Sequence, residues 1–186
     1  MAQHKLFVAA SYVMEGIGMK LTELFLGELE REGKSTRKVL ERVPQGKNAW
    51  KPHERSMNLG YLAALVAQMP GWIEMIITTD DFDLGAPEEG RFRPPEQAST
   101  KDLLALFDAS VAKAKKALTA TNEEHLMKPW SFKMGGQVAS QNPRYVMIQE
   151  SVINHWAHHR GQLTVFLRLN EAKVPAIYGP SADEKF

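Results

Sequence analysis

The sequence contains no cysteine among its 186 residues. This absence excludes disulfide bridges, thiolate nucleophiles and cysteine-based metal sites, and we expect a cytoplasmic protein. Charge of one sign is also scarce, because the formal net charge is +1 and the lysines and arginines are spread along the chain. A nucleic-acid-binding protein would need a clustered basic face, so we expect no nucleic-acid partner.

Long apolar runs are missing as well. No uninterrupted run approaches the roughly 18–20 residues that span a bilayer, so we expect no membrane partner. The apolar stretch KLFVAASYVM is short and no stop-transfer pattern follows it, so we expect residues 1–19 to form an N-terminal arm rather than a signal peptide. With 44% hydrophobic and 24% charged residues, the chain suits a single globular domain over residues 1–186.

Four long segments carry the apolar spacing of amphipathic helices. Pro70 is expected to kink or interrupt the second segment, and Ser56 is expected to cap its start. Four amphipathic helices in one domain predict an all-α fold, a four-helix bundle with long connections. The four segments cover about residues 20–43, 56–79, 99–120 and 143–170.

The stretches between and after these helices are of different kinds. DDFDLGAPEEGRFRPPEQ is acidic and then proline-rich, which is typical of an irregular connection. KPWSFKMGGQVAS predicts a small hairpin-like excursion before the last helix, with Gly135 and Gly136 at its turn. Residues 171–186 are expected to form a C-terminal tail.

The stretch INHWAHHRGQL in the last predicted helix holds three histidines. His155 and His159 are four residues apart, which places both imidazoles on one side of a helix, as a divalent metal ion would require. On a helical wheel both can face the interior, whereas His158 lies on the far side. Gln162 lies beside His155 in angle and is expected to orient that ring. The alternative is two inward histidines that satisfy each other, a backbone carbonyl or a buried acid.

Several motifs occur in a fixed order: STRKVLERVP, KPHERSMNLGYLAALVAQMPGW, LMKPWSFKMGG and VINHWAHHRGQLTVFLRLNEAKVPAIYGPSADE. In this order they resemble the DinB/YfiT-like family of metal-dependent four-helix-bundle proteins, over nearly the whole chain from about residue 25. The resemblance implies a divalent ion held by three histidines. Two of them match His155 and His159, but the first, from the middle of the second helix, falls on Leu65.

Leucine offers no lone pair, and two imidazoles hold zinc or nickel more weakly than three. Glu32 is the best substitute ligand, because it is central on the inward stripe of the first helix, where a carboxylate needs a partner. The resemblance also implies another role for Glu32, because matching family members carry a carboxylate at this place that orients a metal ligand. His53, in KPHERS, is the other spare donor and is expected at the rim of the bundle. A metal-free pocket is the remaining interpretation, and a partly degenerate site is favoured.

Two classes of function follow. The first is a small-molecule or thiol binding protein with a degenerate metal site, or a stress-associated protein, which the resemblance suggests is a homodimer. The alternative is a metal-dependent thiol transferase, isomerase or hydrolase-like enzyme, in which Glu32 or water completes the metal shell. Because the chain has no cysteine, the thiol of such an enzyme would be a cosubstrate.

Overall fold

The computed structural model describes residues 18–85, 94 and 97–185, so most of the expected N-terminal arm over residues 1–19 lies outside the described residues. Helices dominate and a small sheet accompanies them. The elements are α1 (Leu21–Leu40), α2 (Leu59–Gln68), the 3₁₀ turn η1 (Met69–Gly71), α3 (Trp72–Thr78), β1 (Asp81–Asp83), α4 (Thr100–Ala120), α5 (Glu123–Leu126), β2 (Pro129–Met134), β3 (Gln137–Pro143), α6 (Arg144–Met147), the π-helix η3 (Ile148–Asn154) and α7 (His155–Leu169).

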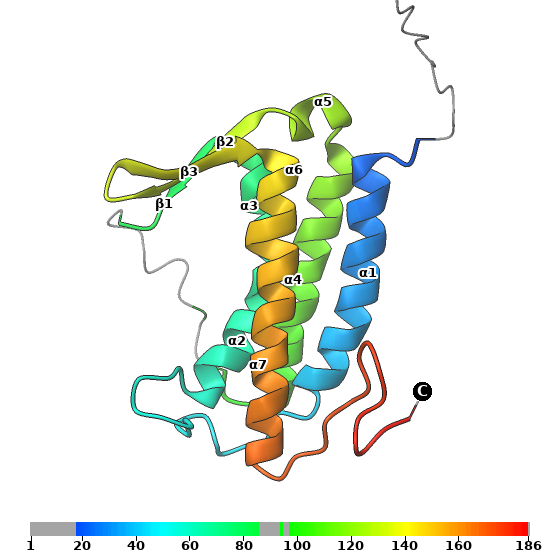
Figure 1. Cartoon of the computed structure of the whole chain (residues 1–186), viewed down its shortest axis with the longest axis vertical. Coiled ribbons are helices and arrows are strands. Elements are labelled where there is room, and N and C mark those ends of the chain that lie inside the picture. Colours follow the sequence, from blue (N-terminus) through cyan, green and yellow to red (C-terminus); the bar gives the residue numbers. More distant parts are fainter. Residues whose placement is uncertain (1–17, 86–93, 95–96, 186) are drawn as a thin grey trace, which may run out of the picture.

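The long helices stand side by side, and the sheet projects from one end of them (Figure 1). Helix α4 packs against α1, α2 and α3, and α7 packs against α1 and α2. Helices α6, η3 and α7 follow one another as a single rod. The predicted predominance of helix is confirmed, and the long helices lie within the four predicted segments, while the short α5 lies outside them. The prediction of an all-α fold is wrong in one respect, because a three-stranded sheet is present.

Local side-chain chemistry explains where the helices begin and break. The second helix begins later than predicted, because Asn58 and not Ser56 caps it, accepting a hydrogen bond of 2.8 Å from the N–H of Tyr61. Ser99 caps α4 by accepting from the N–H of Asp102 at 3.2 Å. Pro70 lies in the 3₁₀ turn that separates α2 from α3, so the predicted interruption is confirmed.

The segment Leu59–Thr78 corrects the statement that no apolar stretch is long enough to span a bilayer. It has 20 residues and a mean hydropathy of 1.3, so it is long and apolar enough to cross a membrane by length and composition alone. However, 61% of its most apolar window is buried inside the structure. This is the behaviour of a helix in a protein core, where Leu62, Val66 and Ile73 are fully buried.

The sheet has the strand order β1–β2–β3, with β1 parallel and β3 antiparallel to β2. The predicted hairpin is confirmed, and Gly135 and Gly136 at its turn have φ of +58° and +81°, a conformation that favours glycine. Strand β1 was not predicted. The carboxylate of Asp83 at its end accepts hydrogen bonds from the N–H groups of Gly85, Gly135 and Gly136 at 2.6–2.9 Å, which ties β1 to the hairpin turn.

Candidate functional site

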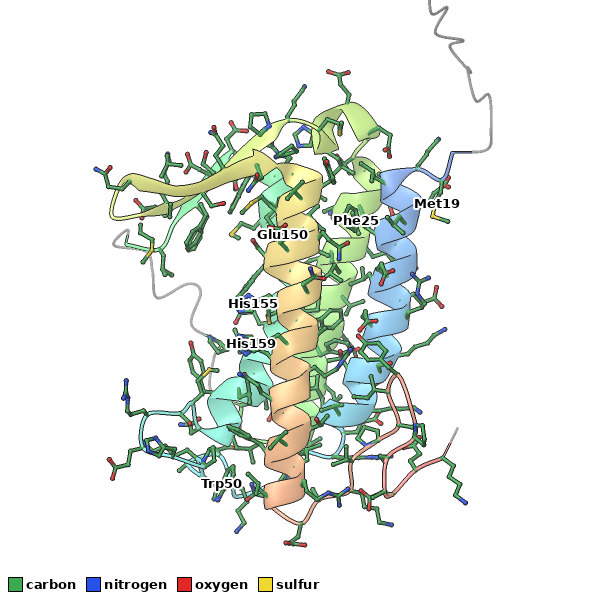
Figure 2. The ribbon with its side chains drawn as sticks, viewed as in Figure 1. Met19, Phe25, Trp50, Glu150, His155 and His159 are labelled. Atoms are coloured by element: carbon green, nitrogen blue, oxygen red, sulfur yellow. The ribbon has the colours of Figure 1, made fainter. Side chains whose placement is uncertain are left out.

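His155 and His159 of α7 lie one below the other along the last helical rod, with Glu150 above them (Figure 2). The ring centroids of His155 and His159 are 4.5 Å apart, as their four-residue spacing predicts. The side chain of His159 is 8% exposed. His158 is exposed, as the helical wheel predicts, although its ring centroid lies 5.1 Å from that of His159.

His155 is exposed, whereas Trp156 and Leu163 of the same helix are fully buried. His155 therefore lies at the edge of the buried side of α7, and its ring lines the pocket next to that side. The expectation that both imidazoles face the interior holds for His159 and not for His155. The segment Ile148–Asn154 before His155 is a π-helix, whose wider turns hold more residues than the 3.6 of an α-helix.

Hydrogen bonds determine which ring nitrogens are free. The side-chain oxygen of Gln162 lies 2.8 Å from Nδ1 of His159, and the Gln162 amide nitrogen lies 3.0 Å from Nε2 of His158. This chain of bonds assigns the proton of His159 to Nδ1 and leaves its Nε2 as an acceptor. Gln162 therefore orients His159, and the expectation that it orients His155 is wrong. A ring N–H of His155 donates to the backbone carbonyl of Ser151 instead.

The imidazoles of His155 and His159 both favour the neutral form. Burial lowers the pKa of His159 below 6.5, and the neighbouring rings of His155 and His158 lower it further, against an opposing hydrogen bond with Gln162. Burial also lowers the pKa of His155, with the Ser151 carbonyl opposing it. Since the His155 ring is exposed, solvent screens its electrostatic interactions more strongly, so His159 is the stronger basis for an argument about pH.

Leu65 and His155, which the sequence places 90 residues apart, line the same pocket. The pocket has a volume of about 570 Å³, and its walls come from α2, α3, the sheet and the rod formed by α6, η3 and the start of α7. Most of its lining side chains are apolar or aromatic. The lining residues are Tyr61, Leu65, Trp72, Met75, Ile76, Phe82, Leu84, Trp130, Phe132, Met147, Glu150, Ser151, Val152 and His155.

The aromatic wall of this pocket was missed by sequence reasoning. Trp130 and Phe132 are two residues apart on β2 and therefore face the same side of the strand. The two-residue spacing of the aromatic residues in PWSFKM could have predicted this. Phe82 comes from β1 and lies with its ring centroid 6.1 Å from that of Phe132. Trp130 is 2% exposed and its indole N–H donates to Thr79 at 3.2 Å, so its polar edge is already satisfied. Glu150 and Ser151 were also missed, since their inward position depends on η3.

The two other candidate ligands lie elsewhere. Glu32 is buried, as its stripe predicted, but its carboxylate forms an ion pair of 2.5 Å with Arg160 and accepts a hydrogen bond of 2.8 Å from the hydroxyl of Tyr178. The expectation that Glu32 completes a metal shell therefore does not fit its contacts. His53 is exposed in the connection before α2, where its Nδ1 accepts from the N–H of Arg55 at 3.2 Å.

The side chains present do not fit the three-histidine ion that the resemblance implies. His155 and His159 suit two of the positions, because two imidazoles on one tetrahedral ion have centroids about 5 Å apart and each ring has one nitrogen held by an acceptor. The third position that the resemblance implies falls on Leu65, which lines the same pocket as His155 and has no donor atom. Among the residues the structure describes, no three histidine, aspartate or glutamate side chains are arranged to hold a metal ion.

Comparison with known proteins identifies the family. A sequence model of the DinB family matches residues 18–185. The chain belongs to the DinB family. Among curated proteins, the uncharacterized protein YrdA of Bacillus subtilis (strain 168) is 27% identical over 160 residues, which cover 86% of this chain and 89% of YrdA.

Solved DinB-like structures share the fold. A DinB-like protein from Bacillus cereus ATCC 10987 gives a TM-score of 0.64 at 22% identity, covering 83% of this chain and 95% of that one. The DinB-like protein YjoA from Bacillus subtilis gives a TM-score of 0.61 at 18% identity, covering 81% and 93%. At this identity the likeness establishes the fold, and function has to be argued from the site.

Proposed function

We propose that this DinB-family protein binds an apolar small molecule in the pocket between the sheet and the π-helix. The observation that carries the proposal is the pocket itself. Its volume of about 570 Å³ lies in the range of small-molecule sites, and its lining combines an apolar wall with a few polar groups. Glu150, Ser151 and His155 are grouped on one side of it, on η3 and the first residue of α7.

The geometry around this polar group supports a binding role. A π-helix is rare and occurs frequently at functional sites. Here it brings Glu150 and Ser151 to the pocket, while the Ser151 carbonyl holds the ring of His155 at the rim. Trp72 packs near that ring, with centroids 6.0 Å apart, and its buried indole N–H meets no acceptor in the described part of the chain.

A titration with the neutral dye Nile red tests this proposal. The emission of the dye should rise on binding. Met75→Trp adds a large ring to the pocket wall and fills part of the space for the dye, so it should weaken binding at least about ten-fold, which corresponds to about 1.4 kcal/mol. The matched control is Leu169→Trp, since Leu169 is 53% exposed and lies outside the pocket. Equal binding by both variants, with circular dichroism showing both folded, would reject the pocket.

The metal-dependent thiol transferase or isomerase is a second proposal, and the paired imidazoles of His155 and His159 support it. Leu65 opposes it, so the discriminating experiment compares Zn²⁺ and Ni²⁺ affinity in the untagged native protein and in Leu65→His. We expect weak binding by the native protein and tight binding by the variant, because a third imidazole would then complete the donor set. Submicromolar binding by the native protein would favour the enzyme.

A further inference from the structure

We propose that the ligand of this pocket carries a positive charge, as an organic amine or ammonium group attached to an apolar or aromatic body. The inference rests on the proposed function and specifies its ligand class. It follows from the charges and rings that line the pocket in the described part of the chain.

Glu150 supplies the charge. Among the described residues that line the pocket, it is the only one with a formal charge, and none of them is a lysine or an arginine. Its side chain is exposed, and it forms no ion pair or hydrogen bond within the part of the chain that the structure describes. Other exposed acids of this protein are paired, as Glu30 is with Lys34 and Asp81 with Lys133. An unpaired carboxylate beside an apolar wall attracts a cation and repels an anion.

The aromatic side chains supply the second part of a cation site. Trp72, Phe82, Trp130 and Phe132 all line the pocket. The faces of such rings attract ammonium groups, with tryptophan the strongest, and this attraction grows where water is excluded. Trp72 and Phe132 suit this role best, because each is only partly buried, whereas Trp130 is 2% exposed and forms the packed back of the wall.

An anionic ligand has no counterpart here. A carboxylate, sulfate or phosphate group would meet Glu150, and no cationic side chain among the described lining residues would offset the repulsion. A neutral apolar molecule would leave the Glu150 carboxylate without a partner. A cationic apolar molecule satisfies both the carboxylate and the rings.

Three probes with one body and three charges test the charge preference: phenylbutylamine, phenylbutanol and phenylbutyrate. Each is measured by displacement of Nile red at low salt, from the native protein and from Glu150→Gln. The control variant is Glu54→Gln, which removes an equivalent exposed charge from a connection outside the pocket.

We expect the native protein and Glu54→Gln to bind the amine about five-fold more tightly than the alcohol, as for one solvent-screened charge pair, and to bind the carboxylate most weakly. Glu150→Gln should bring the amine to the affinity of the alcohol and leave the alcohol unchanged. An unchanged amine preference in Glu150→Gln, or strongest binding of the carboxylate, overturns the charge assignment while the pocket stands. If no probe displaces the dye and the dye itself does not bind, the proposed function fails too.

Discussion

The buried ion pair between Glu32 and Arg160 allows a quantitative prediction. The Arg160 side chain is 1% exposed and that of Glu32 is 11% exposed, and the two charged groups are 2.5 Å apart. Removing one member of such a pair leaves a buried charge uncompensated, which typically costs about 3–5 kcal/mol. In Glu32→Met the guanidinium keeps its bonds to the Glu32 backbone carbonyl, Thr36 and Tyr178. We therefore expect a loss near the lower end, about 3 kcal/mol.

The double variant Glu32→Met/Arg160→Met distinguishes this reasoning from a simple loss of contacts. Since apolar side chains of similar size replace both charges, its stability should be close to that of the native protein, well above the sum of the single losses. The free energy of unfolding is measured by urea titration with far-ultraviolet circular dichroism. Glu30→Met, which breaks the exposed pair with Lys34, is the control and should show no measurable change. Single losses below about 1 kcal/mol, or additive losses in the double variant, would refute the reasoning.

Three further predictions concern the histidines, the sheet and assembly. Because the pKa of His159 in the folded protein is below 6.5, the unfolded protein takes up this proton first as the pH falls. The free energy of unfolding should therefore be highest above about pH 6.5 and should decrease as the pH drops toward the folded pKa. Urea midpoints at several pH values should show this decrease, which should be smaller in His155→Ala/His159→Ala. Asp83→Ala should speed amide hydrogen exchange at Gly135, because its N–H loses the carboxylate acceptor; unchanged exchange would contradict this. The homodimer stays a prediction, and the exposed Val165 on α7 offers an apolar contact for it, so light scattering should find a dimer that Val165→Glu weakens.

Much of the fold was predictable because local signals and packing agree in the long helices. The apolar spacing located α1 and α4 to within a few residues, and the Ser99 cap and the Pro70 interruption follow from side-chain and backbone chemistry that acts locally. Strand β1 was not predictable in the same way, since Asp81–Asp83 has no strand pattern and is held by pairing with a strand some fifty residues away.

The site was only partly predictable for a similar reason. The spacing of His155 and His159 brings their rings together on one helix, but the partners of Glu32 depend on Arg160 and on Tyr178 in the tail, which spacing within α1 does not reveal. The pocket requires side chains from α2, α3, β1, β2, α6, η3 and α7 to meet. The sequence pattern of one segment does not predict contacts between side chains of distant segments unless a known motif indicates them.

The wide winding of Ile148–Asn154 has a consequence for how relatives of this chain are compared. A π-turn holds about one residue more than an α-turn, so a one-codon deletion there would let the rod continue as an ordinary α-helix while the imidazoles of α7 keep nearly their present facing. A one-codon deletion elsewhere in the rod would instead turn every later side chain by about 100°. What a deletion in the π-helix would change is the wide turn that carries Glu150 and Ser151. Among homologues, a single gap at this spot would therefore mark a cavity whose polar side differs while its histidines stay in place.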